Sequence, residues 1–190
     1  IEYECEDMLQ LKVSKDKMSF NDGLRAILRH DPDVIIVGEV RDEETAQICF
    51  KAAATGHLVI STIHTNDAIN VISRLQMLGI TNDVIEENLR ISVAQRLVKK
   101  LCQNCSQEFL EIINGEKTKV LSANPQGCSD SNCVNGYENR RQIILQTVDE
   151  KQINNFLKTG SKEGIKKLQE VAIGYAKKGV IAYSDALTVA

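Results

Sequence analysis

Apolar and polar positions in the first part of the chain follow the spacing of a helix. Within residues 19–29 the apolar side chains recur every three or four positions, at Phe20, Leu24, Ile27 and Leu28. Ser19 precedes this run as a candidate N-cap. Pro32 follows it and disfavours helical backbone at the residue before it. The pattern therefore predicts a helix over residues 19–29.

Two short, continuous apolar runs come next. Residues 34–37 are four consecutive β-branched side chains, and residues 57–62, with an apolar centre at residues 58–60, form a second candidate strand. Continuous runs of this length are typical of strands buried on both faces of a parallel sheet. Helical spacing separates and follows them, over residues 43–54 and 67–78, and a further helix is expected to begin near Thr81. The alternation of strands and helices predicts an α/β fold with a parallel sheet.

The composition and periodicity of the sequence change after Leu101. Residues 102–137 are rich in Cys, Asn, Ser and Gly and have little periodicity, so they predict a loop-rich insertion. Helical spacing returns from Asp149. We therefore expect three parts: a parallel-sheet domain over residues 1–101, a cysteine-bearing element over residues 102–140, and a helical C-terminal part over residues 141–190.

Composition narrows the class of protein. The chain has 190 residues, of which 43% are hydrophobic, and a formal net charge of −3, which argues against a general attraction to nucleic acid or anionic lipid. No apolar run is long enough to span a bilayer. Acidic residues near the start contradict a signal peptide, and the first residue is Ile, so we expect a piece of a longer protein with reduced thiols.

Glu39 is the strongest local indication of chemistry. It follows the apolar run of residues 34–37, and a hydrophobic strand that ends in an acid is the Walker B arrangement. Such a strand holds a carboxylate at the edge of the sheet where open α/β sheets bind ligands. There Glu39 could orient a water for attack on a γ-phosphate or support a Mg²⁺ shell. The alternative is an acid that only caps the next helix, a role that we expect of Asp42.

Of the three histidines, one is placed to act together with this acid. His64 lies just past the second apolar run, at the same predicted edge as Glu39, where it could donate a hydrogen bond to a terminal phosphate. The alternative is an ordinary loop histidine. His57 begins that run, at the opposite edge, and is expected to be structural or interfacial. His30 follows the first helix and suits the negative end of its dipole.

Three segments closely resemble the ATPases of type II secretion and type IV pilus assembly. They are GLRAILRHDPD at residues 23–33, GEVRDEETA at residues 38–46 and TGHLVISTIHTND at residues 55–67. The opening Ile-Glu-Tyr resembles the end of the family's Asp box, and the resemblance extends over nearly the whole chain. It implies part of a RecA-like, parallel-sheet ATPase core, with a tetracysteine zinc-binding insertion and a helical C-terminal part.

The resemblance also implies roles for individual residues and the cofactors ATP and Mg²⁺. Glu39 would polarise the attacking water, Glu2 would be a further catalytic glutamate, and His64 would report on the γ-phosphate. Further family positions, implied to contact nucleotide or a neighbouring subunit, are matched by Arg25, Arg29, Arg41, Asp42, His57 and Thr65. Which arginine would act between subunits stays open.

Four of the six cysteines form two closely spaced pairs. They are Cys102 with Cys105 and Cys128 with Cys133. Such pairs suit a tetrahedral thiolate site, which selects Zn²⁺ or an iron–sulfur centre. The resemblance favours zinc, although the family's second pair usually has two intervening residues where this chain has four. The alternative is four free thiols. Cys5 and Cys49 stand alone and are expected to be packing residues.

The 190 residues contain no G-x-x-x-x-G-K-[ST] phosphate-binding loop, which the family places upstream of its Asp box. We therefore expect a C-terminal fragment of a motor for pilus assembly, secretion or DNA uptake, which alone binds ATP weakly and does not hydrolyse it. The resemblance implies a homo-hexamer at the cytoplasmic face of the inner or plasma membrane. It would act on an inner-membrane platform protein, through partners and without nucleic acid.

Two other classes of function are alternatives to a motor. A zinc-stabilised module could bind a protein partner through its helical tail and have no catalysis of its own. A zinc-ribbon protein that binds nucleic acid is disfavoured by the acidic balance and by the scarcity of aromatic residues for stacking.

Overall fold

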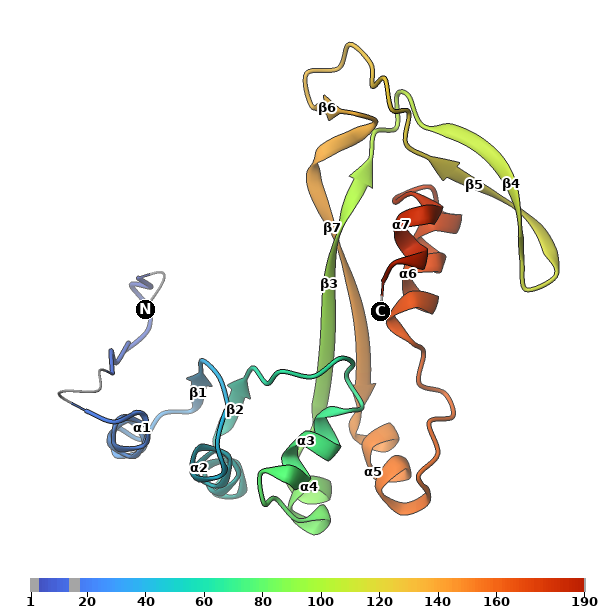
Figure 1. Ribbon diagram of the computed structural model, residues 1–190. Helices are drawn as coiled ribbons and strands as arrows, with labels where there is room; N and C mark the ends of the chain where they lie inside the picture. Colours follow the sequence, from blue (N-terminus) through green and yellow to red (C-terminus); the bar gives the residue numbers. More distant parts are fainter. Residues whose placement is uncertain (1–3, 14–17, 190) are drawn as a thin grey trace. The chain divides into compact units, whose positions relative to one another are not determined.

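The computed structural model describes residues 4–13 and 18–189 (Figure 1). Contacts divide these residues into two units. Unit 1 comprises the described residues up to Thr65 together with residues 70–90, and unit 2 comprises residues 66–69 and the described residues from Ile91 onward. None of the described helices is both long enough and apolar enough to cross a membrane.

Unit 1 alternates helices with a pair of parallel strands. Its elements are α1 (Phe20–Leu28), β1 (Val34–Val37), α2 (Glu43–Ala54), β2 (Leu58–Ser61), α3 (Val71–Met77) and α4 (Asn82–Asn88). β1 and β2 pair in parallel, from Val34 opposite Leu58 to Val37 opposite Ser61. The predicted strands, their parallel pairing and the helix over residues 43–54 are confirmed.

Local capping explains where the first two helices begin. The Ser19 hydroxyl accepts a hydrogen bond from the Asp22 backbone N–H at 3.1 Å, and α1 begins at the next residue. The Asp42 carboxylate accepts one from the Thr45 N–H at 2.8 Å, and α2 begins directly after it. These acceptors satisfy N–H groups that have no partner inside a helix, so the sequence alone locates both helix starts.

The prediction that both strands are buried on both faces is wrong. In β1, Ile35 and Val37 are 2% and 3% exposed, whereas Val34 and Ile36 are 49% and 58% exposed. Alternate residues of a strand point to opposite faces, so one face of this pair is covered and the other is open among the described residues. β2 is largely exposed as well. An apolar run encodes the strand but not the layers that cover it.

Unit 2 is built on a long antiparallel ribbon, which Figure 1 shows beside two helices. Its strands are β3 (Ile91–Leu101), β4 (Gln107–Ile113), β5 (Glu116–Ser122), β6 (Cys133–Val134) and β7 (Tyr137–Asp149). The helices α5 (Glu150–Thr159), α6 (Leu168–Lys177) and α7 (Tyr183–Leu187) follow. β3 pairs with β7, from Ile91 opposite Asp149 to Lys99 opposite Arg141, and β6 lies on the other side of β7.

One face of this ribbon packs on α6 and α7. The core comprises Val98, Ile144, Leu168, Ala172, Ala176, Ile181, Ala186 and Val189. Along β7, the buried residues Ile144, Gln146 and Val148 alternate with exposed ones, and Ile144 belongs to this core. Three alanines on the helices allow close approach to the ribbon.

Two expectations for the second half of the chain are wrong. The supposed loop-rich insertion contains β4 and β5, which form a hairpin around Asn114 and Gly115. Both turn residues have positive φ, 54° and 84°, as the favoured two-residue hairpin turn requires. The helical part begins at Glu150 rather than at residue 141, because β7 extends to Asp149. Asp149 then caps α5 in a reciprocal capping box with Gln152.

Candidate functional site

Glu39 lies just past the carboxyl end of β1, and two hydrogen bonds fix the chain around it. The Val40 N–H donates to the Thr62 carbonyl at 2.9 Å, and the Thr62 hydroxyl donates to the Gly38 carbonyl at 2.6 Å. These bonds extend the parallel alignment of β1 and β2 beyond the strand ends. The segments that contain Glu39 and His64 therefore leave the sheet side by side.

The Glu39 carboxylate contacts the side chains of His64 and Arg41. His64 Nε2 lies 3.1 Å from Oε1, and Arg41 donates from Nε to Oε2 at 2.6 Å and from Nη2 to the same oxygen at 2.5 Å. The Glu39 side chain is 18% exposed, whereas that of His64 is 91% exposed. The prediction that Glu39 and His64 lie at the same edge is confirmed by this contact.

Electrostatics keep Glu39 ionised. The hydrogen bond from Arg41 lowers the pKa of the Glu39 carboxyl, and the charges of Arg41 and His64 add to this against the opposing effect of burial. The same ion pair raises the pKa of Arg41. At neutral pH the site therefore presents a fixed carboxylate with an exposed imidazole beside it, an arrangement suited to orienting a water or supporting a metal-bound one.

Other predicted site residues of unit 1 have structural partners. Asp42 caps α2, as expected. Arg25 forms ion pairs with Glu44 at 2.7 Å and with Asp22 at 3.5 Å, which link α1 to α2. Arg29 is the exposed C-cap of α1. These contacts are separate from the Glu39 carboxylate.

His57 closes the C-terminal end of α2. Its Nδ1 lies 3.0 Å from the Ala52 carbonyl and 3.2 Å from the Thr55 hydroxyl. It precedes β2, whereas His64 follows it, so the two histidines lie at opposite ends of that strand. Thr65 is the last residue of unit 1 before the chain enters unit 2. Glu2, the second predicted catalytic acid, lies outside the described residues.

The four paired cysteines form one cluster in unit 2. Their sulfur atoms all lie within 4.8 Å of one another. Cys102 Sγ is 3.8 Å from Cys128 Sγ, and Cys105 Sγ is 3.7 Å from Cys133 Sγ. A regular tetrahedron of sulfurs around zinc, with Zn–S bonds of ~2.3 Å, has edges of ~3.8 Å. The donor set and its spacing therefore fit a tetrahedral Zn²⁺ site.

Short local hydrogen bonds shape the two cysteine loops. The Cys102 N–H donates to the Gly136 carbonyl at 2.9 Å, which joins the end of β3 to the second loop. Asn104 Nδ2 donates to Asp130 Oδ2 at 2.8 Å, and the Asn132 N–H donates to Asp130 Oδ1 at 2.8 Å. Asp130 thus organises the longer gap between Cys128 and Cys133, so the unusual spacing still brings all four sulfurs together.

Crowding of the four thiols affects their pKa values. Burial, together with the neighbouring thiols, raises the pKa of the Cys105 thiol to about 12. Thiolates crowded at this distance repel one another, so they cannot all ionise without a cation. A bound Zn²⁺ would reverse this, because zinc ligands are thiolates.

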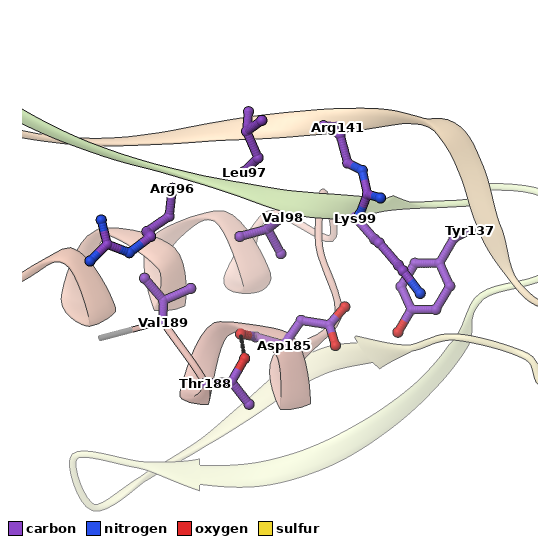
Figure 2. Close-up of a pocket in the computed structure, with 9 residues that line it drawn as sticks. All are labelled: Arg96, Leu97, Val98, Lys99, Tyr137, Arg141, Asp185, Thr188 and Val189. Atoms are coloured by element: carbon purple, nitrogen blue, oxygen red, sulfur yellow. Dashed lines mark hydrogen bonds between the residues drawn. The ribbon is translucent and has the colours of Figure 1, made fainter.

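A separate pocket of about 410 Å³ lies in unit 2, between the ribbon and α7 (Figure 2). No motif or periodicity in the sequence indicates this pocket. Lys99 lies over the Tyr137 ring, 5.1 Å from its centre, and Arg141 and Asp185 line the same pocket. Burial and the neighbouring Asp185 raise the pKa of Tyr137 to about 12. None of the residues that line this pocket belongs to the predicted catalytic set.

Comparison with known proteins gives a consistent result. The sequence profile described as "Type II/IV secretion system protein" matches residues 1–182. The chain is 48% identical over 151 residues to the type II secretion system protein E of Dickeya dadantii (strain 3937), covering 75% of this chain and 30% of that protein. It is 34% identical over 205 aligned positions to the type IV pilus assembly ATPase PilB of Pseudomonas aeruginosa, covering 97% of this chain and 36% of that protein.

Solved structures agree on the fold. The pilus retraction motor PilT, determined with bound ADP, superposes with a TM-score of 0.60 at 27% identity, covering 93% of this chain and 45% of that one. The ATPase DotB of Legionella pneumophila gives 0.58 at 20% identity, covering 88% and 41%. The fold is therefore the RecA-like α/β fold of these ATPases, and the chain spans about a third of the length of the curated relatives. On the match of its sequence over residues 1–182, this chain belongs to the type II/IV secretion system protein family.

Proposed function

We propose that this chain is the C-terminal part of an ATP-hydrolysing motor for type IV pilus assembly, type II secretion or a competence pseudopilus. The contact between Glu39 and His64 at the carboxyl ends of two parallel strands supports this function most directly. Relatives that include a type IV pilus assembly ATPase support the same reaction. The nucleotide phosphates would be held by a loop outside these 190 residues, which contain no such motif.

In this proposal Glu39 orients the attacking water. Its pKa is lowered by Arg41, so its carboxylate is a weak base and a strong hydrogen-bond acceptor. Phosphoryl transfer depends mainly on positioning and electrostatic stabilisation, so an acceptor of fixed direction suits the reaction better than a strong base. ATP with Mg²⁺ would supply the reactive phosphate. Arg41 holds one carboxylate oxygen and His64 contacts the other, which fixes the direction of both.

His64 would sense the γ-phosphate. Its side chain is 91% exposed, so the imidazole is accessible to a ligand while its Nε2 contacts Glu39. A phosphate oxygen near this edge would compete with Glu39 for the histidine N–H. Loss of the γ-phosphate would return His64 to Glu39, so the contact would differ between the two nucleotide states.

The remaining predicted residues have supporting roles in this proposal. Arg29, exposed at the end of α1, and Arg41 are candidates for contact with nucleotide or a neighbouring subunit. Asp42 and His57 hold opposite ends of α2, so they would act through the position of that helix. The resemblance also assigns Arg25 and Thr65 to nucleotide binding and Glu2 to catalysis.

The four cysteines would hold one Zn²⁺ with a structural role. It would join the end of β3 to β6 through the two cysteine loops and leave no open coordination position for chemistry. By resemblance, residues 1–101 would belong to the ATPase domain, residues 102–140 to the zinc element and the rest to a C-terminal subdomain. The motor would be a homo-hexamer at the cytoplasmic membrane face, acting on a platform protein of the inner membrane.

The test of this function is ATP hydrolysis by the full-length protein and by the 190-residue chain. Glu39→Gln is expected to lower kcat in the full-length protein by at least ~10²-fold, with nucleotide binding retained. Glu43→Gln is the matched control, since Glu43 is an exposed acid on α2 and contacts Gln47. The chain alone is expected to show no turnover. Turnover by the chain alone, or full activity of Glu39→Gln, would contradict the proposal.

A second candidate is a zinc-stabilised module that binds a protein partner without catalysis. The observation in its favour is that the sulfur atoms of four cysteines lie close enough together to hold one metal ion. Absence of ATP hydrolysis in the full-length protein, with one zinc bound per chain, would favour this candidate.

A further inference from the structure

Gln103 lies between two of the clustered cysteines, Cys102 and Cys105, and its side chain contacts a segment far along the chain. Its Nε2 donates a hydrogen bond to the Gly179 carbonyl at 2.9 Å. A carbonyl oxygen only accepts hydrogen bonds, so this partner determines which end of the amide faces it. The proposed function assigns no role to this contact, which joins residues 76 positions apart.

A second hydrogen bond supports the same link from the end of β3. The Leu101 N–H donates to the Val180 carbonyl at 2.9 Å. Leu101 is fully buried, and Cys102 is 2% exposed. Residues on either side of Cys102 therefore hold two consecutive carbonyls of the distant segment.

The distant segment comprises residues 178–182, which join α6 to α7 and which we call the α6–α7 connection. It also packs closely against β5. Gly179 has a φ of 71°, and a Cβ added there would lie 2.9 Å from Leu121 Cδ1 on β5. Ile181 and Ala182 are fully buried. The connection is thus held both by the β4–β5 hairpin and by the end of β3 with the loop that follows it.

A metal ion at the cysteine cluster would restrict the first cysteine loop, residues 102–105. Cys102 and Cys105 both belong to the cluster, in which all four sulfur atoms lie within 4.8 Å of one another. Bonds from one ion to both sulfurs would fix the two ends of this loop, and Gln103 lies between those ends. Gln103 is exposed, so packing does little to locate it. The direction of its amide therefore depends on the shape of the loop.

We propose that Gln103 couples metal binding at the four cysteines to the position of the α6–α7 connection. This inference rests on the zinc site of the proposed function and gives that site a second task. A bound ion fixes the loop, the loop directs the Gln103 amide, and the amide holds the Gly179 carbonyl. Gln103 is a positioning residue, since the ligands of the ion are the four sulfurs. Such coupling is reciprocal: the factor by which the docked connection raises metal affinity is the factor by which the metal favours docking.

The first test measures the affinity of this chain for Zn²⁺ by competition with a chelator. Gln103→Leu keeps the charge and nearly the size of the side chain but cannot donate to the Gly179 carbonyl. It is expected to lower the affinity about fivefold, the effect of losing one typical hydrogen bond. Gln126→Leu is the matched control, because Gln126 is exposed and lies just before Cys128 in the second cysteine loop. Equal affinities of these two variants would overturn the inference.

A second variant changes the other end of the link and decides the matter if Gln103→Leu does not fold. Gly179→Ala places a Cβ against Leu121 and strains a residue of positive φ, so it should displace the α6–α7 connection. By reciprocity it should lower the affinity for Zn²⁺ at least about threefold. Gly160→Ala is the control, because Gly160 has a φ of 70°, but an added Cβ would meet no described neighbour within 4 Å. Equal affinities of the two alanine variants would contradict the coupling.

Amide exchange at Val180 measures the state of the connection directly. The Val180 N–H donates to the Tyr175 carbonyl at 3.1 Å, at the end of α6. Adding Zn²⁺ should slow this exchange at least about fivefold in the unmodified chain and by a smaller factor in Gln103→Leu. If the chain binds Zn²⁺ and exchange at Val180 does not respond, the inference fails and the proposed zinc site stands. If the chain binds no Zn²⁺, the zinc site and the coupling both fail, and exchange at Val180 in Gln103→Leu still decides whether Gln103 holds the connection.

Discussion

Zinc binding by the four cysteines is expected to depend steeply on pH. Each thiol that is protonated in the metal-free protein must lose its proton when zinc binds. Burial and the neighbouring thiols raise the pKa of Cys105 to about 12. The pKa of Cys102 is also raised: the Asn104 backbone N–H lowers it, but burial and the other thiols outweigh this effect. Both thiols are therefore protonated at neutral pH in the metal-free protein.

The pKa of the Cys133 thiol shifts in the opposite direction. It is lowered, because burial, which raises it, is outweighed by hydrogen bonds from backbone groups such as that of Gly136. Cys102 and Cys105 each release a proton when zinc binds, so we expect at least two protons released per zinc. The apparent affinity should therefore fall at least about 10²-fold for each unit by which the pH is lowered.

Competition with a chromogenic chelator at several pH values measures this slope. Cys105→Ser should abolish binding of zinc at one ion per chain. Cys5→Ser, which changes a lone exposed cysteine, should leave both the stoichiometry and the slope unchanged. A slope of about one proton or fewer, or tight zinc binding by Cys105→Ser, would refute the reasoning from the cluster.

Three further predictions concern stability and the charge of the site. Ile144→Ala should lower the free energy of unfolding in urea by about 3 kcal/mol, because Ile144 is fully buried, whereas Ile143→Ala, at a half-exposed neighbour, should cost less than about 1 kcal/mol. Asp42→Ala should cost about 1 kcal/mol in the same assay through loss of the α2 cap. Arg41→Ala should raise the pKa of Glu39 toward its ordinary value of 4.5, as followed by carboxyl NMR. A carboxyl whose pKa is lowered by folding contributes stability that is lost as the pH falls through the lowered pKa. Arg41→Ala removes this contribution, so the free energy of unfolding of this variant should depend less on pH in acid. An unchanged pKa of Glu39 would contradict the ion pair.

The part of the site that could be predicted is the part encoded by short segments. Glu39 and His64 each follow an apolar run, and parallel pairing of the runs places both at one edge, as the structure confirms. Cysteine spacing likewise predicted which four sulfurs lie together. In both cases a few consecutive residues determine the local backbone. A single strand pairing or loop closure then brings the side chains together.

The strands of unit 2 and the partner of Gln103 could not be located in this way. β3 pairs with β7 across more than thirty intervening residues, so no local pattern indicates that they are partners. Both faces of β3 contain apolar residues, which hides the alternation of a strand. The Asn114-Gly115 turn was a visible signal of the β4–β5 hairpin, but its flanking strands contain many charged residues.

The sequence by itself determined the helix starts at Ser19, Asp42 and Asp149, the turn at Asn114 and the set of four cysteines. These features depend on hydrogen bonds and sequence spacings within a few residues, so they do not require contacts with distant parts of the chain. Only the tertiary structure decided which face of β1 is covered and what Gln103 holds. Those outcomes depend on segments distant in sequence that must first be brought together, and the free energy of doing so is set by the packing of the whole unit.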